Sequence, residues 1–351
     1  MLRFLGMSGR ATIAFSVVFG LLTGAVGSAQ EPVRLRVEPL TVPPATQPLI
    51  GVVVENLRDQ PWRGELSLAG PDGWRIAPES RTIEVPASGE RRFAFNIEKA
   101  RNVEANSYPL RVTARVGDQV VERSQAVFVA SAPYSKAVVD GRADEWQDAI
   151  PVTFQDQGKR TTVRTFWSRK RFYLLVTVQE DQHVGEPGPG RRLVDAVQLA
   201  VSPLDDADGP ARTSQRAEWL LRAGDGGADC YQLAAVDTPI ASAGPARDLE
   251  LLRCRDVEVA IQRKGDVTHY ECAIPFRLLR DAVEPAEGRE FFLSVLVHDP
   301  DGTGLRDLGR AAGLWARAAD AAAWSRWPGA AWEKTPPLGN KVRWGLCTSK
   351  Y

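Results

Sequence analysis

A strongly strand-like run of this chain is Arg171-Phe172-Tyr173-Leu174-Leu175-Val176-Thr177-Val178. A second stretch of the same kind is Val194-Asp195-Ala196-Val197-Gln198-Leu199-Ala200-Val201. Runs of this length that are rich in valine and aromatic residues are typical of strands. Similar runs follow at Tyr270–Phe276 and Phe292–Asp299, so the second half of the chain is predicted to be a β-structure.

Helix is suggested at only two places in this half, Pro275–Leu279 and Arg310–Ala323.

The first half of the chain, from Val33 to Ala130, reads as short strands separated by turns. Several of its runs alternate apolar and polar residues, which is the period of a half-buried strand. Val116-Gly117-Asp118-Gln119 lies between two runs and suits a tight hairpin. About seven strands in roughly 100 residues predict a β-sandwich of immunoglobulin type. The runs are Val33–Val37, Leu49–Glu55, Gly64–Ala69, Thr82–Val85, Arg92–Ile97, Ser107–Arg115 and Gln119–Val129.

This first half also resembles the bacterial immunoglobulin-like modules that are often appended to glycan-processing enzymes. The resemblance rests on Pro71-Asp72-Gly73-Trp74, on Val85-Pro86-Ala87-Ser88-Gly89-Glu90 and on Ser107-Tyr108-Pro109-Leu110. Such modules are mostly spacers, which is the role that the resemblance implies here.

The N-terminus has the pattern of a signal peptide. Arg3 and Arg10 precede the uncharged apolar segment Ala11–Leu22, and Gly27-Ser28-Ala29 supplies small residues for cleavage before Gln30. We therefore expect residues 1–29 to be removed and the protein to be exported to the periplasm or the extracellular space. An uncleaved N-terminal anchor is the alternative. No second apolar run of membrane length follows, so we expect no membrane span after cleavage.

The charge balance argues against nucleic acid as a partner. The chain has 44 basic and 44 acidic residues. Two basic residues belong to the leader, so 42 basic and 44 acidic residues remain and the net charge becomes −2. A near-neutral chain with scattered charges offers no electrostatic surface for a polyanion.

All four cysteines lie in the second half: Cys230, Cys254, Cys272 and Cys347. In an oxidising compartment they allow up to two disulfides in any of three connectivities. None belongs to a C-x-x-C pair, so zinc binding and thioredoxin-like chemistry are not indicated.

The second half contains an ordered set of motifs. It begins with Val138-Val139-Asp140-Gly141-Arg142-Ala143-Asp144-Glu145-Trp146, a strand followed by an Asp-Gly turn and a tryptophan that folds back onto the core. The strands quoted above and a late Ala273-Ile274-Pro275-Phe276 turn follow in order. Together these residues resemble carbohydrate-binding modules of family 9, over Ala137 to the C-terminus. The resemblance implies a β-sandwich of antiparallel strands.

The predicted organisation is therefore all-β, with two sandwich domains after the leader. An immunoglobulin-like sandwich spans residues 30–131, a linker spans 132–136, and a family 9-like, jelly-roll-type sandwich spans 137–351.

The family resemblance also implies a sugar site. In that family two tryptophans clamp a terminal sugar, and polar side chains read its hydroxyl groups. Trp332 matches one clamp position, whereas Arg192 stands at the other, where its guanidinium could stack or pair with an anionic sugar. Gln198 stands at the position of the acidic reader. Half of the clamp is thus altered, and the alternative is a relative that uses only the scaffold.

The segment Trp324-Ser325-Arg326-Trp327-Pro328-Gly329-Ala330-Ala331-Trp332 places three tryptophans in nine residues. Binding residues concentrate in such loops, but loop tryptophans also cover cores, and both roles stay open. Trp332 is the first choice for ligand contact and Trp327 the second. Trp146, Trp167 and Trp219 lie in or beside strands and are expected in the core.

No nucleophile motif, phosphate loop or H-E-x-x-H appears, so the protein is not expected to be an enzyme. The only methionines, Met1 and Met7, belong to the leader, which argues against the haem-binding relatives. His298-Asp299-Pro300-Asp301-Gly302 has part of a calcium-loop pattern but is expected to be a turn. No cofactor is predicted, and a structural calcium elsewhere in the sandwich stays open.

Three functions remain after this reading. The preferred one is an exported, non-catalytic carbohydrate-binding protein whose glycan contacts are Trp332, Trp327, Arg192 and Gln198. The second is an envelope protein that reuses the scaffold for interaction with a protein partner. The third is a glycosidase, for which no pair of carboxylates can be singled out.

Overall fold

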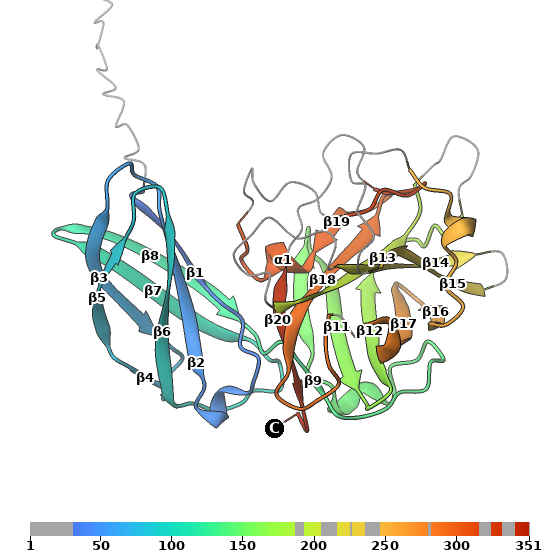
Figure 1. The fold of residues 1–351 in the computed structure, drawn as a ribbon, viewed down its shortest axis with the longest axis horizontal. Coiled ribbons are helices and arrows are strands. Elements are labelled where there is room, and N and C mark those ends of the chain that lie inside the picture. Colours follow the sequence, from blue (N-terminus) through green and yellow to red (C-terminus); the bar gives the residue numbers. More distant parts are fainter. Residues whose placement is uncertain are drawn as a thin grey trace, which may run out of the picture. The chain divides into compact units, whose positions relative to one another are not determined.

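The computed structural model describes residues 31–186, 193–204, 216–224, 227–235, 246–279, 282–315, 324–331 and 341–350. The predicted signal peptide, residues 1–29, lies outside these ranges. The described residues are all-β apart from short helical turns, which confirms the predicted fold class (Figure 1). None of their helices is long and apolar enough to cross a membrane.

The first half forms two four-stranded sheets. Their strands enclose an apolar core that includes Val52, Leu66, Phe95 and Val112. One sheet has the order β1 (Val33–Val37), β2 (Leu49–Asn56), β6 (Glu90–Lys99), β4 (Arg75–Ala77); the other has the order β5 (Ser80–Val85), β3 (Trp62–Ala69), β7 (Tyr108–Val116), β8 (Gln119–Val127).

The predicted hairpin at 116–119 is confirmed. Val116 at the end of β7 pairs with Gln119 at the start of β8, and Gly117 adopts a φ of 52° in the turn between them. A glycine suits this position because a left-handed φ carries no Cβ penalty there. The strand that the pattern missed is β4, which has only three residues.

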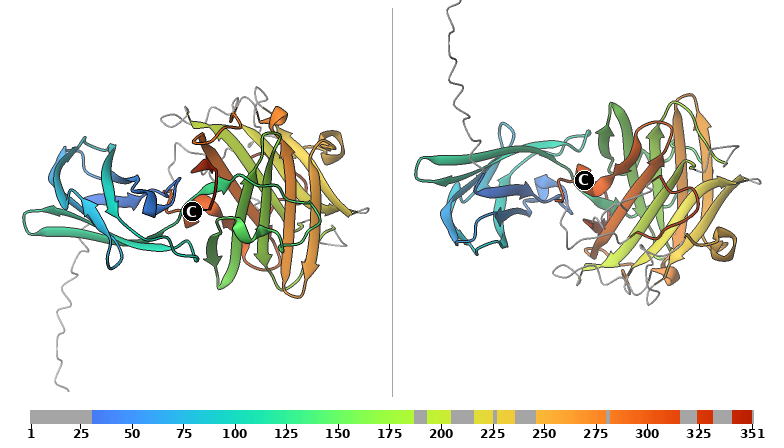
Figure 2. Two further views of the ribbon diagram at one scale, coloured as in Figure 1. Left: turned by 90° about the horizontal axis from the view of Figure 1, so that it is seen from below. Right: turned by 90° about the horizontal axis from the view of Figure 1, so that it is seen from above.

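The second half forms a larger sandwich of a five-stranded and a seven-stranded sheet (Figures 1 and 2). The five-stranded sheet has the order β10 (Val152–Asp156), β11 (Lys159–Trp167), β12 (Arg171–Gln179), β17 (Val267–Pro275), β16 (Glu258–Lys264). The other has the order β15 (Gly227–Ala234), β14 (Ala217–Gly224), β13 (Ala196–Pro203), β18 (Glu290–Asp299), β20 (Val342–Cys347), β9 (Ser131–Pro133), with β19 (Gly304–Asp307) paired to β18.

The predicted linker at 132–136 is partly a strand. β9 adds to the edge of the seven-stranded sheet, parallel to β20, with Ser131 opposite Gly345. The Ser131 hydroxyl donates to the Gly345 carbonyl at 3.1 Å, and Ser131 and Ala132 are fully buried. Because the side chains of Ser131 and Ala132 are small, this segment can pair with β20 at the edge of the sheet. The sequence pattern had predicted only a linker here.

Both sheets of the second sandwich are covered on their outer faces as well as on their inner faces. The inner faces enclose the main core, which includes Leu174, Leu199 and Val295. Trp146 packs on the outer face of the five-stranded sheet, stacked on Phe166 at 4.9 Å, and Trp324 packs on the outer face of the other sheet. Strands that are buried on both faces read as continuous apolar runs, which explains the sequences of β12 and β13.

The helical elements are single turns. One 3₁₀ turn, η6 (Phe276–Leu278), lies inside the predicted Pro275–Leu279 helix. The described part of the second prediction contains the end of α1 (Leu308–Ala311), which Asp307 caps by accepting from the Gly309 and Arg310 amides; residues 316–323 lie outside the described ranges. The other 3₁₀ turns among the described residues are η1 (Pro44–Thr46), η2 (Trp146–Asp148) and η5 (Leu249–Leu252).

The four cysteines are free, so the structure contains neither of the disulfides that the sequence allowed. Cys230 and Cys272 are buried in the core between the sheets, and burial raises the pKa of both thiols. Cys347 donates its thiol hydrogen to the Ser349 carbonyl at 3.3 Å. No disulfide therefore contributes to holding the sandwich together.

Candidate functional site

Three polar side chains lie on the outer face of the seven-stranded sheet, in the middle of otherwise apolar strands. They are Gln198 on β13, Glu218 on β14 and His298 on β18, and all three are fully buried. Alternate residues of a strand share a face, so Gln198 lies with Ala196 and Ala200 rather than with Val197 and Leu199 of the inner core. The loop at 324–331 covers these three side chains.

Gln198 is the centre of this polar network. Its Oε1 accepts from the Trp327 indole N–H at 3.0 Å and from His298 Nε2 at 2.9 Å. Its Nε2 donates to a Glu218 carboxylate oxygen and to the Ser325 carbonyl, the latter at 3.1 Å. The side-chain amide of Gln198 thus makes two hydrogen bonds through its oxygen and two through its nitrogen, which uses its full hydrogen-bonding capacity.

Glu218 fixes the start of the loop. Its carboxylate accepts from the Ser325 amide at 3.0 Å and from the Ser325 hydroxyl at 3.2 Å. The buried Arg216 lies 3.9 Å from the same carboxylate, and its guanidinium is 4.4 Å from the centre of the Trp324 ring. Burial raises the pKa of Glu218 and lowers the pKa of Arg216, because the charged form of each loses water.

His298 fixes the end of the loop. Its Nδ1 accepts from the Ala331 amide at 3.0 Å, and its Nε2 bonds to Gln198, so the neutral tautomer with hydrogen on Nε2 fits both contacts. A proton on Nδ1 would face the Ala331 N–H. Burial lowers the pKa of His298 to about 3, which keeps the imidazole neutral.

The predicted contacts fall into two groups. Arg192 and Trp332 lie outside the described residues. Gln198 and Trp327 are described, and both are buried and bonded to each other, with Trp327 exposed by only 2%. The two loop tryptophans that the structure describes, Trp324 and Trp327, thus cover the sheet.

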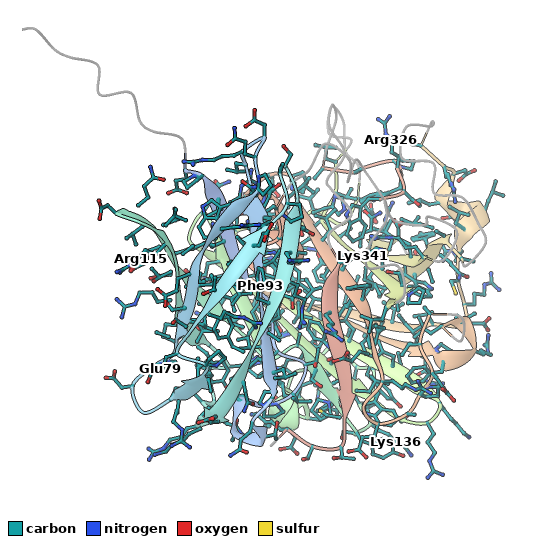
Figure 3. All side chains as sticks on the ribbon, turned by 60° about the vertical axis from the view of Figure 1, so that its left-hand side comes forward. Glu79, Phe93, Arg115, Lys136, Arg326 and Lys341 are labelled. Carbon is teal, nitrogen blue, oxygen red and sulfur yellow. The ribbon has the colours of Figure 1, made fainter. Side chains whose placement is uncertain are left out.

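Residues that are close to Arg192 and to Trp332 in the sequence lie near each other in the structure. Val194, two residues after Arg192, donates its amide to the Gly329 carbonyl at 3.3 Å. Ala331, immediately before Trp332, bonds to His298. Arg326 points away from the sandwich between its buried neighbours (Figure 3), and Pro328 is exposed. The outward side of this loop therefore has residues that a ligand could reach.

On the five-stranded sheet, a buried glutamate likewise holds the covering segment that contains Trp146. Glu271 on β17 accepts from the Asp140 and Gly141 amides at 3.0 and 2.7 Å, and from the Trp146 indole N–H at 3.0 Å. Trp146, Trp167 and Trp219 are buried, which confirms their expected place in the core. The Asp-Gly turn and the tryptophan of the first motif are therefore anchored by one carboxylate.

The sequence interpretation missed Glu218, Ser325 and His298 as members of this network. The one available signal was a polar residue inside an apolar run, at the position of Gln198 and of Glu218. Since the partners are 107 and 127 residues apart along the chain, spacing could not pair them.

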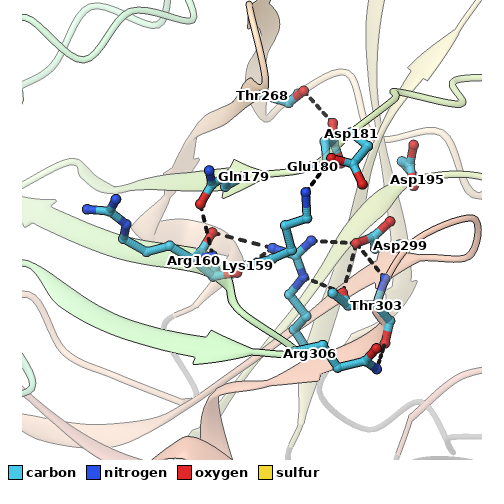
Figure 4. A network of polar contacts seen from close by, with 12 residues as sticks. Lys159, Arg160, Gln179, Glu180, Asp181, Asp195, Thr268, Asp299, Thr303 and Arg306 are labelled. Atoms are coloured by element: carbon cyan, nitrogen blue, oxygen red, sulfur yellow. Dashed lines mark hydrogen bonds and ion pairs between the residues drawn. The ribbon is translucent and has the colours of Figure 1, made fainter.

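A second polar cluster lies where β12, β13 and β18 end or begin. Glu180, His183 and Asp195 form one group of possible metal ligands, and Asp195, Asp299 and Asp301 form another. Burial is the main cause that raises the pKa of Asp195, to about 7, and the nearby Glu180 and Asp301 charges raise it further. In Figure 4 the Asp195 carboxylate lies near Asp299 and takes part in none of the contacts drawn.

Comparisons with known proteins give resemblance in structure only. No family model matches the chain, and no curated protein is significantly similar to it in sequence. A family 9 carbohydrate-binding module from Caldicellulosiruptor kristjanssonii, in complex with cellotriose, is 12% identical with a TM-score of 0.38, over 62% of this chain and 93% of that one. A module of this family from the same organism, in complex with glucose, is 13% identical with a TM-score of 0.35, over 50% and 81%.

A protein of unknown function from Porphyromonas gingivalis W83 is also similar, at 12% identity and a TM-score of 0.21, over 79% of this chain and 97% of that one. Over part of its length the chain thus has a distant structural resemblance to family 9 modules.

Proposed function

We propose that the second sandwich is a non-catalytic carbohydrate-binding module that takes its ligand beside the loop at 324–331. The observation that carries this proposal is the way the loop is held. A ring of buried bonds through Gln198 ties Ser325, Trp327 and His298 together. A tryptophan-rich loop that is fixed in this way loses little entropy when a ligand binds.

The proposed roles divide the four predicted residues into two pairs. Trp332 stacks on the apolar face of a sugar ring, and Arg192 pairs with hydroxyl groups or with the carboxylate of an acidic sugar. Trp327 and Gln198 support the loop from below, because both are buried and bonded to each other. Arg326, which points outward beside them, is a further candidate for contact (Figure 3).

The rest of the chain fits an accessory role in this proposal. The immunoglobulin-like sandwich serves as a spacer, and the leader directs the protein to the periplasm or the extracellular space. The acidic and basic residues of the network are used to hold the loop, which supports binding rather than catalysis.

The test is a glycan array probed with the mature protein, repeated with Trp332→Ala. We expect retention on a restricted set of glycans, and a loss of at least about tenfold in affinity for the variant, since a stacked aromatic anchor contributes on the order of 2 kcal/mol. Trp74→Ala, in the first sandwich, is the control and keeps wild-type binding. Absence of binding to any glycan, together with a co-purifying protein partner, would favour the interaction protein instead.

A further inference from the structure

Beside the segment that contains Trp146, the outer face of the five-stranded sheet carries a row of polar side chains. Each strand contributes one member, and the members lie opposite each other in the antiparallel pairing from β10 to β16. They share the face with Phe166 and Leu175, which Trp146 covers, because alternate residues of a strand point the same way. This polar row consists of Thr153, Thr162, Thr177, His269 and Gln262.

The polar row is a regular series of hydrogen-bonding groups. The hydroxyls of Thr153 and Thr162 lie 3.0 Å apart, and the Thr177 hydroxyl lies 3.2 Å from His269 Nδ1. Thr153 is exposed at one end of the row, and Thr177 and His269 are half-buried. Neighbouring strands are about 4.8 Å apart, so the row is about 19 Å long. This is the length of a short oligosaccharide in an extended conformation, and hydroxyl, imidazole and amide groups are those that read sugar hydroxyls.

Three cations flank the polar row. Arg160 and Arg164 lie on either side of Thr162 along β11, each two positions away. Lys264 lies two positions after Gln262 on β16. All three therefore share the face of the row. Among the described residues none of the three forms an ion pair, and in Figure 4 the Arg160 guanidinium takes part in none of the contacts drawn.

Cations without a carboxylate partner distinguish this face from the outer faces of the first sandwich. There Arg63 pairs with Glu84 at 3.0 Å, and Arg92 pairs with Glu38 at 2.6 Å. Arg164 is half-buried, burial lowers its pKa, and no carboxylate opposes this effect. A carboxylate supplied by a ligand would pair with this guanidinium, whose planar fork binds carboxylates through two hydrogen bonds.

We propose that the polar row and its three cations bind a second glycan, an extended polysaccharide that bears carboxylates. The polysaccharide lies along the row and crosses the five strands, and one of its uronate groups pairs with Arg164. This site goes beyond the proposed function, because the loop at 324–331 is held on the other sheet. Arg160 and Lys264 are far apart in the sequence, so the scattered charges along the chain did not predict a surface for an anionic polymer.

His269 reports on this site, because it lies in the row beside the cations. Burial is the main cause that lowers its pKa, Arg164 and Lys264 lower it further, and Asp144 raises it. A carboxylate bound at Arg164 would add a negative charge close to the imidazole. The pKa of His269 should therefore rise when the ligand binds.

The test is the retention of the mature protein in affinity gels that contain polygalacturonate, alginate or hyaluronate. We expect retention by at least one of these uronate polymers and none by its methyl-esterified form, which has the same backbone without the charge. Arg164→Gln should weaken binding by about tenfold or more, because a charge-assisted pair is lost. Arg169→Gln is the matched control: it removes the same charge at an exposed position between β11 and β12, and should bind like the wild type.

Thr177→Val keeps the shape of the side chain and should weaken binding by about threefold, which tests the row even if Arg164→Gln fails to fold. Titration of the histidine NMR signals should show a higher pKa for His269 with a uronate oligosaccharide than without it. Trp332→Ala should keep this binding, so a failure of the loop site leaves the second site standing. The proposal is overturned if no uronate polymer retains the protein, if the methyl ester or single-stranded DNA retains it equally, if folded Arg164→Gln binds like the wild type, if the pKa of His269 does not move, or if Trp332→Ala abolishes retention.

Discussion

At the scale of single residues, Gln198 is the group whose removal tests the buried network most directly. Gln198→Ala would leave the Trp327 indole N–H, the His298 Nε2 and the Glu218 carboxylate each without one partner. We expect the free energy of unfolding in urea to fall by about 2–4 kcal/mol. Gln262→Ala, at an exposed position of β16, should change it by less than about 0.5 kcal/mol. Equal losses in the two variants would contradict the network.

Because His298 is buried in its neutral form, we expect it to make the stability of the folded protein depend on pH. Its pKa is about 3 in the folded protein, against 6.5 as the ordinary value. As pH falls below 6.5, the unfolded chain takes up a proton that the folded protein refuses, so this residue lowers stability toward acid. We expect the Tm of His298→Asn to fall less between about pH 7 and about pH 5 than that of the wild type. The comparison cancels the opposite contributions of Glu218 and Glu271, whose raised pKa values are common to both proteins. Parallel curves would show that His298 is not responsible.

At the scale of elements, each sheet of the second sandwich is covered by a segment that a buried glutamate holds. Glu271 holds the segment with Trp146, and Glu218 holds the segment with Trp324. Covering both outer faces is what turns β12 and β13 into continuous apolar strands. The buried polar residues Gln198 on β13, Glu218 on β14 and Glu271 on β17 mark the places where a covering segment is bound.

A substitution in the Asp140-Gly141 turn tests how closely the segment with Trp146 packs on the five-stranded sheet. Gly141 has a φ of 80°, and a Cβ there would lie 2.8 Å from Gln262 Cβ on β16. We expect Gly141→Ala to lower the free energy of unfolding by about 2–4 kcal/mol, from backbone strain and from overpacking. Gly158 has the same φ with no atom within 4 Å of such a Cβ, so Gly158→Ala should cost only the strain, about 1–2 kcal/mol. If the two losses are equal, the segment does not lie this close to β16.

At the scale of the whole molecule, the structure predicts that the protein is stable without disulfides. All four cysteines are free, and the core between the sheets includes Cys230 and Cys272 as apolar side chains. Alkylation in denaturant without reductant should therefore modify four thiols per chain, as read by mass spectrometry, and a reducing agent should leave the Tm unchanged. A chain with two thiols modified would show that a bridge forms after all.

The candidate site shows how far prediction from sequence reached. Strand content, the hairpin at Gly117 and the core place of Trp146 followed from local pattern, because alternation and turn chemistry are properties of neighbouring residues. Gln198 was singled out through family resemblance and Trp327 through the tryptophan-rich loop, but the expected role of both was ligand contact. The burial of both residues could not be read from the sequence, since it depends on the loop at 324–331 folding onto β13.

The strand content of this protein could be predicted from its sequence, because periodicity and turn residues act over a few positions. The sequence also supplied each carboxylate of the Asp195 cluster and each member of the Gln198 network. Which of these residues meet depends on strand pairing: Asp195 and Asp299 are brought together by the pairing of β13 with β18, and Gln198 meets Glu218 by the pairing of β13 with β14. Antiparallel pairing joins residues about 20 to 100 positions apart, and no local pattern contains that distance.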